Sequence, residues 1–182
     1  MLRIKDIYNS EIKEKLMKEL SIKNAFSVPS ISKAVINVGV GEAVANKKAI
    51  EHVQQQIEQI TGQKTVVTKA KKSIAAYKIR KGLAIGVKVT LRGDKMYYFI
   101  DKLINIVIPR LRDFRGISHS SVDQHGNLNL GFTEQTIFPE IEYDKIDKIR
   151  GLEVTIVTST TNREHGKKLF ELLGVPFKKD TN

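Results

Sequence analysis

The alternation of apolar and polar positions predicts helices and strands that are mixed along the chain. Apolar residues recur every four positions at Ile12, Leu16 and Leu20, which predicts a first helix starting at a cap near Asn9 or Ser10. After Val28-Pro29 the period changes to two, which predicts a strand with one apolar and one polar face. The apolar face of that strand consists of Ala34, Ile36, Val38 and Val40.

The same periodicities predict the remaining elements. Helices are expected over 46–62, 94–108 and 162–174, and strands over 64–69, 85–92, 127–132 and 153–158. Most of these strands have one apolar face, which is typical of an antiparallel sheet with helices packed on one side. We therefore predict an α+β fold with helices on one face of the sheet and a long basic hairpin loop. Without repeats or a low-complexity linker, we expect a single domain over 1–182.

Composition narrows the classes of protein. The chain of 182 residues has no cysteine, so disulfide scaffolds, thiolate metal sites and cysteine nucleophiles are excluded. No apolar run is long enough to span a membrane, and we expect a soluble, cytoplasmic protein. The net charge of +11 favours a polyanionic partner, with nucleic acid ahead of an acidic membrane surface. An inert basic surface is the alternative that charge alone leaves open.

The segment between the strands at 64–69 and 85–92 is strongly basic. Tyr77, Ile74 and Ile79 lie among its cations, and no acidic residue falls between Lys69 and Gly82. The cations are Lys69, Lys71, Lys72, Lys78, Arg80 and Lys81. Such a loop can pair phosphates with its cations while Tyr77 stacks on a base, and we expect it to be mobile in the free protein. A solvated loop without a ligand is the alternative.

The polar face of the sheet is the second candidate for binding. Its short polar groups and cations suit the sugar–phosphate backbone of RNA, and glycines at 39, 86 and 131 would let another backbone approach. An ordinary solvated sheet face is the alternative. The residues predicted to point outward are Asn37, Lys88, Thr90, Arg92 and Asn129.

Signs of enzymatic chemistry are weak. The Gly39–Glu42 turn lies between a strand and a helix, but it lacks the glycine spacing and the Gly-Lys-Ser/Thr of a phosphate-binding loop. His119, Asp123 and His125 lack the spacing of a metal site, and the acidic stretch at 134–144 is interpreted as architectural. We expect no catalytic residue, metal or cofactor. The alternative is a nucleotide-binding enzyme that uses the Gly39–Glu42 turn.

Longer stretches carry a family resemblance. The run IEQITGQKTVVTKAKKS at 57–73 resembles the signature of the bacterial large-subunit ribosomal protein L-five family, which binds 5S rRNA. The similarity includes NVGVGE at 37–42, KVTLR at 88–92, PRLRDFRG at 109–116 and LLGVPF at 172–177. It covers essentially the whole chain in order.

The resemblance implies a ribosomal protein that binds 5S rRNA and seats it in the central protuberance, beside 23S rRNA and other proteins of that region. The residues it assigns to 5S rRNA, together with their neighbours on the polar face, are Asn37, Gln63, Thr65, Lys88, Thr90 and Arg92. The protruding loop at 72–82 is implied to reach tRNA in the peptidyl site. Its contact residues are Lys72, Ser73, Tyr77, Lys78, Arg80 and Lys81.

A third surface is implied at 109–116, which would bridge to ribosomal protein S-thirteen in the head of the small subunit. The bridge residues are Arg110, Arg112, Asp113 and Arg115. The chain departs from the family pattern at Ser30, where a basic residue is usual, and at Ala76 and Ala84, where Gly and Pro are usual. These departures affect one expected RNA contact and the flexibility of the loop.

Overall fold

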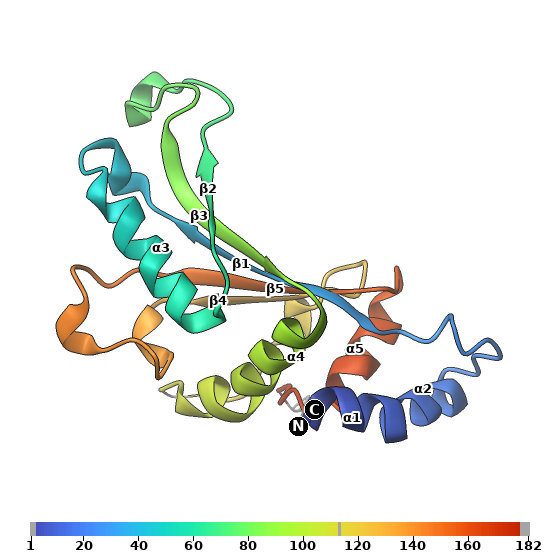
Figure 1. Ribbon diagram of the computed structural model, residues 1–182. Helices are drawn as coiled ribbons and strands as arrows, with labels where there is room; N and C mark the ends of the chain where they lie inside the picture. The colour runs from blue at the N-terminus through green and yellow to red at the C-terminus, as the bar shows by residue number, and fades with distance from the viewer. Residues whose placement is uncertain (1–2, 113, 179–182) are drawn as a thin grey trace. The chain divides into compact units, whose positions relative to one another are not determined.

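The computed structural model describes residues 3–112 and 114–178 and contains a five-stranded antiparallel sheet with helices packed against it (Figure 1). The strand order is β2-β3-β1-β5-β4. The strands are β1 (Ile31–Gly39), β2 (Val66–Lys69), β3 (Ala84–Leu91), β4 (Leu128–Phe132) and β5 (Leu152–Thr158). The predicted α+β class is confirmed.

The helices include regular, π and 3-10 segments. The α-helices are α1 (Arg3–Ile7), α2 (Lys13–Glu19), α3 (Lys48–Thr61), α4 (Gly93–Lys102) and α5 (Arg163–Leu172). The π segments are η1 (Tyr8–Ile12) and η4 (Leu103–Val107). The 3-10 turns are η2 (Gly41–Val44), η3 (Ala75–Tyr77), η5 (Ile108–Arg110), η6 (His119–Ser121), η7 (Gln135–Ile137) and η8 (Tyr143–Lys145).

The chain forms two compact units whose boundaries cut through β1, β4 and β5. The first comprises Met1–Ala34, Arg92–Leu130 and Thr155–Asn182, and the second comprises Val35–Leu91 and Gly131–Val154. The expectation of a single RNA-binding domain over 1–182 stays a prediction.

In the second unit, α3 packs against β3, the strand next to β1 in the sheet (Figure 1). The alternation in these strands has the predicted effect, because one face is buried while Lys88 on the other face is exposed. The helix ends at Gly62, whose φ of 63° is the left-handed conformation that glycine adopts at low cost. The buried side chains of this layer include Ile36, Val38, Ile50, Val53, Ile57, Ile60, Val87 and Val89.

In the first unit, α1 packs against α4, and Lys5 Nζ donates to Asp94 Oδ1 at 2.8 Å. Helix α5 begins as predicted, since the Asn162 side chain accepts hydrogen bonds from the backbone N–H groups of Glu164 and His165. The buried side chains of this unit include Ile4, Leu16, Ile100, Leu103, Leu169 and Phe170.

Several predicted boundaries were wrong. The first helical segment begins at Arg3 rather than at Asn9 or Ser10, because Ser10 Oγ donates to the Asp6 carbonyl inside the helix instead of capping it. Strand β2 begins at Val66 rather than at 64, because the backbone N–H of Thr65 donates to the Glu58 side chain of α3 and the first pair with β3 is Val66–Lys88. Strand β1 extends back to Ile31, and α4 starts at Gly93.

Candidate nucleic-acid interface

The face of β1 and β3 that points away from the buried layer is polar. Lys88 is exposed, Asn37 and Thr90 are half-buried, and Arg92, the first residue after β3, is exposed. Within 3–112 and 114–178, no ion pair joins Lys88 or Arg92 to a carboxylate. The face therefore presents amide and hydroxyl groups beside cations whose charge is not neutralised within the described protein.

The glycines of this face are not equivalent. A Cβ at Gly86 would lie 2.7 Å from Thr68 Oγ1 and 2.8 Å from the Val38 carbonyl, so the protein itself fills that space. Nothing lies within 4 Å of a Cβ built at Gly39 or Gly131. Close approach of a second backbone is thus available at Gly39 and Gly131, whereas Gly86 serves the packing of the strands.

The turn between α3 and β2 carries Gln63 and Thr65. Gln63 Nε2 donates to the Thr90 carbonyl of β3 at 3.0 Å. The Thr65 backbone N–H donates to Glu58 Oε1 at 3.1 Å, and Gln54 Nε2 lies 3.2 Å from Thr65 Oγ1. The hydroxyl of Thr65 is thus bonded to α3. The side-chain amide of Gln63 keeps its oxygen and one N–H for other partners.

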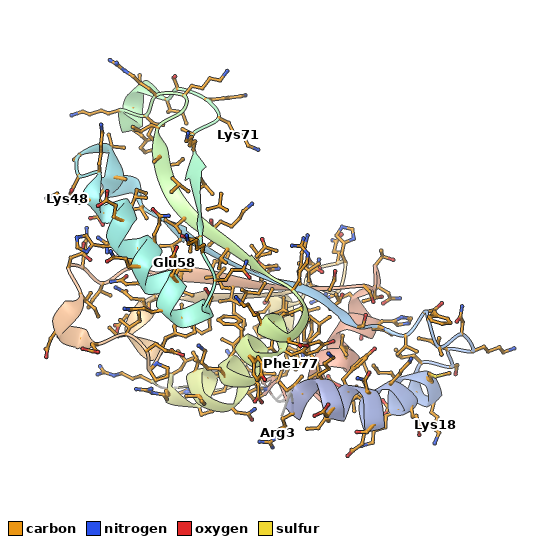
Figure 2. The ribbon with its side chains drawn as sticks, in the orientation of Figure 1. Arg3, Lys18, Lys48, Glu58, Lys71 and Phe177 are labelled. Atoms are coloured by element: carbon orange, nitrogen blue, oxygen red, sulfur yellow. The ribbon has the colours of Figure 1, made fainter. Side chains whose placement is uncertain are left out.

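The basic loop extends beyond the ends of β2 and β3, and the labelled Lys71 lies on it (Figures 1 and 2). Backbone bonds close its base, from Ala70 N to Leu83 O at 2.8 Å and from Gly82 N to Ala70 O at 2.9 Å. Ile74 and Ile79 exchange a pair of backbone bonds at 2.9 and 3.1 Å around the turn η3. The loop is therefore a small hairpin of its own, and its expected mobility in the free protein stays a prediction.

Most side chains of the loop are exposed. Tyr77 is 71% exposed. Ser73 differs from the other predicted contact residues because its Oγ accepts a hydrogen bond from the Lys81 backbone N–H at 2.9 Å. In the described chain, no ion pair neutralises a loop cation. The exposed cations are Lys69, Lys71, Lys72, Lys78, Arg80 and Lys81.

Of the predicted bridge residues, Arg110 is the last residue of η5, and Arg112 and Arg115 follow it in the first unit. Arg110, Arg112 and Arg115 are exposed, whereas Asp113 lies outside the described residues. This short segment therefore presents three guanidinium groups to solvent, which suits an anionic partner surface.

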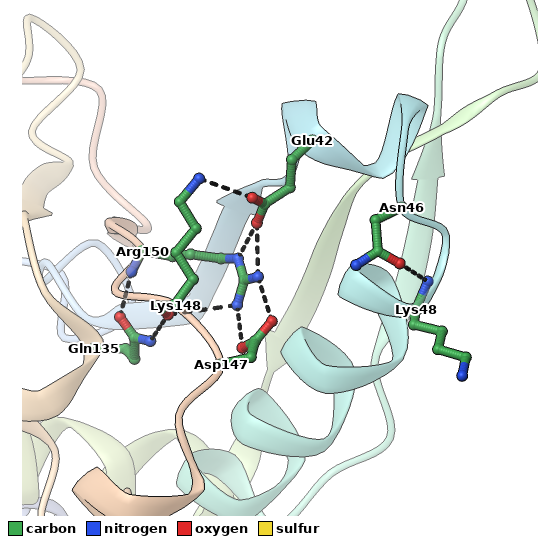
Figure 3. A network of polar contacts seen from close by, with 7 residues as sticks. All are labelled: Glu42, Asn46, Lys48, Gln135, Asp147, Lys148 and Arg150. Carbon is green, nitrogen blue, oxygen red and sulfur yellow. Dashed lines mark hydrogen bonds and ion pairs between the residues drawn. The ribbon is translucent and has the colours of Figure 1, made fainter.

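The Gly39–Glu42 turn holds a polar network instead of a phosphate cradle (Figure 3). Arg150 donates to Asp147 through two nitrogens, at 2.8 and 2.7 Å, and its Nε donates to Glu42 Oε1 at 2.6 Å. Lys148 Nζ donates to the other oxygen of Glu42 at 2.8 Å. Gln135 Nε2 also donates to the backbone carbonyl of Lys148 at 2.7 Å, so Gln135 helps to hold the segment that carries Asp147, Lys148 and Arg150.

These contacts shift the protonation of the acids. The hydrogen bond from Arg150 is the main cause that lowers the pKa of Asp147 from 3.8 to about 2. The pKa of Glu42 is lowered mainly by its hydrogen bond to Lys148. Sequence reasoning missed this network, because Glu42 and Arg150 are separated by 108 positions.

The candidate metal trio has a structural use. Asp123 Oδ1 accepts from the backbone N–H groups of His125 and Asn127 at 2.8 and 2.9 Å, so this carboxylate caps a turn. Among the residues with described structure, no group of three His, Asp or Glu side chains is placed to hold a metal ion.

The comparisons with known proteins identify the family. The family model described as "Ribosomal protein L5" matches residues 24–80, and a second model, which describes the C-terminus of the same ribosomal family, matches 84–177. The chain belongs to the ribosomal protein L5 family. It is 55% identical over 179 residues to "Large ribosomal subunit protein uL5" of Thermoanaerobacter sp. (strain X514), covering 98% of this chain and 100% of that protein. It is 54% identical over 177 residues to the uL5 of Chloroflexus aggregans, covering 97% and 98% of the two chains.

Membership of the L5 family settles the class of protein. This L5-family chain is a protein of the large ribosomal subunit, and it is not an enzyme. The alternative of a nucleotide-binding enzyme at the Gly39–Glu42 turn is therefore wrong, and the Glu42 carboxylate occupies that turn in ion pairs with Arg150 and Lys148. The bacterial relatives place the chain in the ribosome, which lies in the cytoplasm of bacteria. No helix in the described part of the chain is long and apolar enough to cross a membrane.

The structure shows where the three residues that depart from the family pattern lie. Ser30 N donates to Ser159 Oγ at 3.0 Å, and Ser159 N donates to the Ser30 carbonyl at 2.8 Å, so Ser30 links β1 to the end of β5. Ala76 lies within η3 at the turn of the loop, and Ala84 is the first residue of β3.

Proposed function

We propose that this protein binds 5S rRNA through the outward polar face of β1 and β3 and anchors it in the central protuberance of the large subunit. The observation that carries the proposal is the combination of Lys88 and Arg92, which have no ion-pair partner in the described chain, with half-buried amide and hydroxyl groups. Cations neutralise phosphates, while short polar groups donate to and accept from 2′-hydroxyls and base edges. The contact residues are Asn37, Gln63, Lys88, Thr90 and Arg92, and Thr65 supports Gln63.

The basic loop serves a second RNA in this proposal, the tRNA in the peptidyl site. Its five cations are exposed, as is Lys69 at the end of β2, and Tyr77 presents a ring that can stack on a base. Because the loop extends beyond the strand ends, its charge acts away from the sheet face (Figure 1). The contact residues are Lys72, Ser73, Tyr77, Lys78, Arg80 and Lys81, with Ser73 bound internally to Lys81.

A third contact is proposed for Arg110, Arg112, Asp113 and Arg115, which bridge to ribosomal protein S-thirteen of the small subunit. The exposure of the three arginines supports this assignment. Contacts with 23S rRNA and with other proteins of the central protuberance complete the proposed set of partners.

A competition experiment tests the primary proposal. Labelled 5S rRNA is bound to the full chain on filters, and unlabelled 5S rRNA or a scrambled RNA of the same length and composition is added. Unlabelled 5S rRNA is expected to compete at concentrations at least about a thousandfold lower than the scrambled RNA, as specific sites outcompete nonspecific ones. Equal competition by the two RNAs would show that the chain binds RNA by charge alone.

A further inference from the structure

Gln63 lies in a turn that has little backbone support. The register of β2 with β3 begins at the pair Val66–Lys88, so residues 63–65 lie before the first cross-strand pair. The Gln63 side chain nevertheless reaches β3, where its Nε2 donates to the Thr90 carbonyl at 3.0 Å. Something other than the strand ladder must fix the backbone from which Gln63 projects.

Side chains of α3 supply that support. The Thr65 N–H, which lies before the strand ladder, donates to Glu58 Oε1 at 3.1 Å, and Thr65 Oγ1 lies 3.4 Å from the same oxygen. Gln54, one turn earlier on the helix, donates to Thr65 Oγ1 at 3.2 Å. On the other side of Gln63, Thr61 Oγ1 lies 3.3 Å from the Gln63 carbonyl. The turn is thus held from both sides by groups that are themselves half-buried.

We propose that Glu58 is a positioning residue for the RNA-binding face: it holds Thr65 and thereby sets the Gln63 side chain against Thr90. In this arrangement Thr65 faces the protein, and Gln63 presents its remaining amide groups to the RNA. The inference rests on the proposed binding of 5S rRNA by this face and adds a residue that touches no RNA.

The negative charge of Glu58 allows a positioning role to be distinguished from a direct electrostatic effect on RNA binding. Glu58 is an acid near a surface that is proposed to bind a polyanion, so removing its charge should by itself tighten RNA binding slightly. A positioning role predicts the opposite sign, because the backbone N–H of Thr65 loses its acceptor and the turn loosens. The two roles are therefore separated by the direction of the effect.

The experiment compares variants of the full chain in 5S rRNA filter binding at one salt concentration. Glu58→Ala is expected to weaken binding about three- to tenfold, the size of one lost hydrogen bond. Glu58→Gln, which keeps an acceptor oxygen, is expected to bind like the parent or slightly tighter. Glu51→Ala removes an acid from an exposed position of the same helix and serves as the matched control, with binding equal to or tighter than that of the parent.

A double-mutant cycle tests whether Glu58 acts through Gln63. Gln63→Ala alone is expected to weaken binding, and adding Glu58→Ala is expected to cost nothing further, since the positioned group is already gone. Additive losses would overturn the inference. The inference would also be overturned if Glu58→Ala bound 5S rRNA as tightly as Glu51→Ala while Gln63→Ala bound more weakly. In that case the proposed RNA face would still stand. An unaffected Gln63→Ala would instead count against that face at this position.

Thr65→Val keeps the inference testable if Glu58→Ala does not fold, which a thermal melt of each variant reports. Valine removes the hydroxyl but keeps the N–H that donates to Glu58. Binding within about twofold of the parent is expected, because a preserved hydrogen bond leaves the turn in place. A loss as large as that of Gln63→Ala would make Thr65 a direct RNA ligand and overturn the positioning role.

Discussion

At the scale of single residues, we expect hydrogen-bonding groups of the proposed face to contribute to 5S rRNA binding in addition to its cations. Replacing Asn37 or Thr90 by Ala is expected to weaken 5S rRNA binding by about 1–3 kcal/mol each, because a partner group on the RNA loses its hydrogen bond. The dependence of affinity on salt should barely change, since neither variant removes a cation. Filter binding at several salt concentrations measures both quantities, and unchanged affinity in both variants would place the RNA on another surface.

Arg150 is the residue on which the Glu42 network depends. Its side chain is 8% exposed, and it holds Asp147 and Glu42 together. Arg150→Met is expected to lower the free energy of unfolding by about 3 kcal/mol, because two carboxylates lose a buried partner. Lys15→Met, which breaks the exposed pair with Glu11, should cost under about 1 kcal/mol and serves as the control in urea melts. Equal costs for the two variants would contradict the role given to Arg150.

The same network predicts how stability depends on pH. The pKa of Asp147 is lowered from 3.8 to about 2 in the folded state, so its stabilising contribution is complete above pH 4 and is lost as the pH falls toward 2. The lowered pKa of Glu42 adds a loss of the same sign. Urea melts between pH 5 and pH 2 should therefore show a steeper fall in stability for the parent than for Arg150→Met. Parallel curves would show that the ion pair does not persist in solution.

At the scale of elements, the sequence predicted what depends on local pattern. The apolar faces of β1 and β3, the end of α3 at Gly62 and the Asn162 cap of α5 are all confirmed, because periodicity and capping are local properties. The start of the first helix was wrong, because Ser10 has two local uses, capping or bonding the Asp6 carbonyl, and sequence alone does not choose between them.

Specific side-chain contacts between elements could not be predicted from the sequence. Nothing in the local pattern of Glu58 indicates that it accepts from Thr65, and the same holds for Glu42 with Arg150. The RNA contact predicted for Thr65 stays a prediction, and the structure adds that the Thr65 hydroxyl is bonded to Gln54 of α3. The placement of the candidate RNA-binding residues could thus be predicted, whereas their supports could not.

The basic loop is expected to act as an element separate from the sheet face. Replacing Lys78, Arg80 and Lys81 together by Ala should leave 5S rRNA binding nearly intact, because these exposed cations belong to the loop, and the loop extends beyond β2 and β3 (Figure 1). On ribosomes assembled with this variant, peptidyl-site tRNA should dissociate faster, since three phosphate contacts are lost.

A matched variant controls for the change in net charge. Replacing the exposed Lys18, Lys23 and Lys47 by Ala removes the same charge from other elements and should leave tRNA dissociation unchanged. If the loop variant loses 5S rRNA binding instead, the loop belongs to the primary RNA surface.

At the scale of the whole molecule, the excess of basic residues becomes intelligible in a ribosomal protein. The net charge of +11 is balanced in the particle by RNA phosphates, and the described ion pairs hold the protein together elsewhere, as at Arg150 and at Lys5. The cations of the outward face and of the loop have no such partners in the described chain. The outward face and the loop therefore carry cations whose charge is free to neutralise RNA phosphates.

The most direct test of the central claim is a salt titration of 5S rRNA binding by the full chain. Because each neutralised phosphate contributes roughly −0.7 to −0.9 to the slope of log K against log salt, the account predicts a slope of about −2 or steeper from Lys88, Arg92 and their neighbours. It also predicts that preference for 5S rRNA over scrambled RNA persists as salt rises, since hydrogen bonds to the RNA are not screened. A slope near zero would contradict binding of 5S rRNA by this face. So would a preference for 5S rRNA over scrambled RNA that disappears as the salt concentration rises.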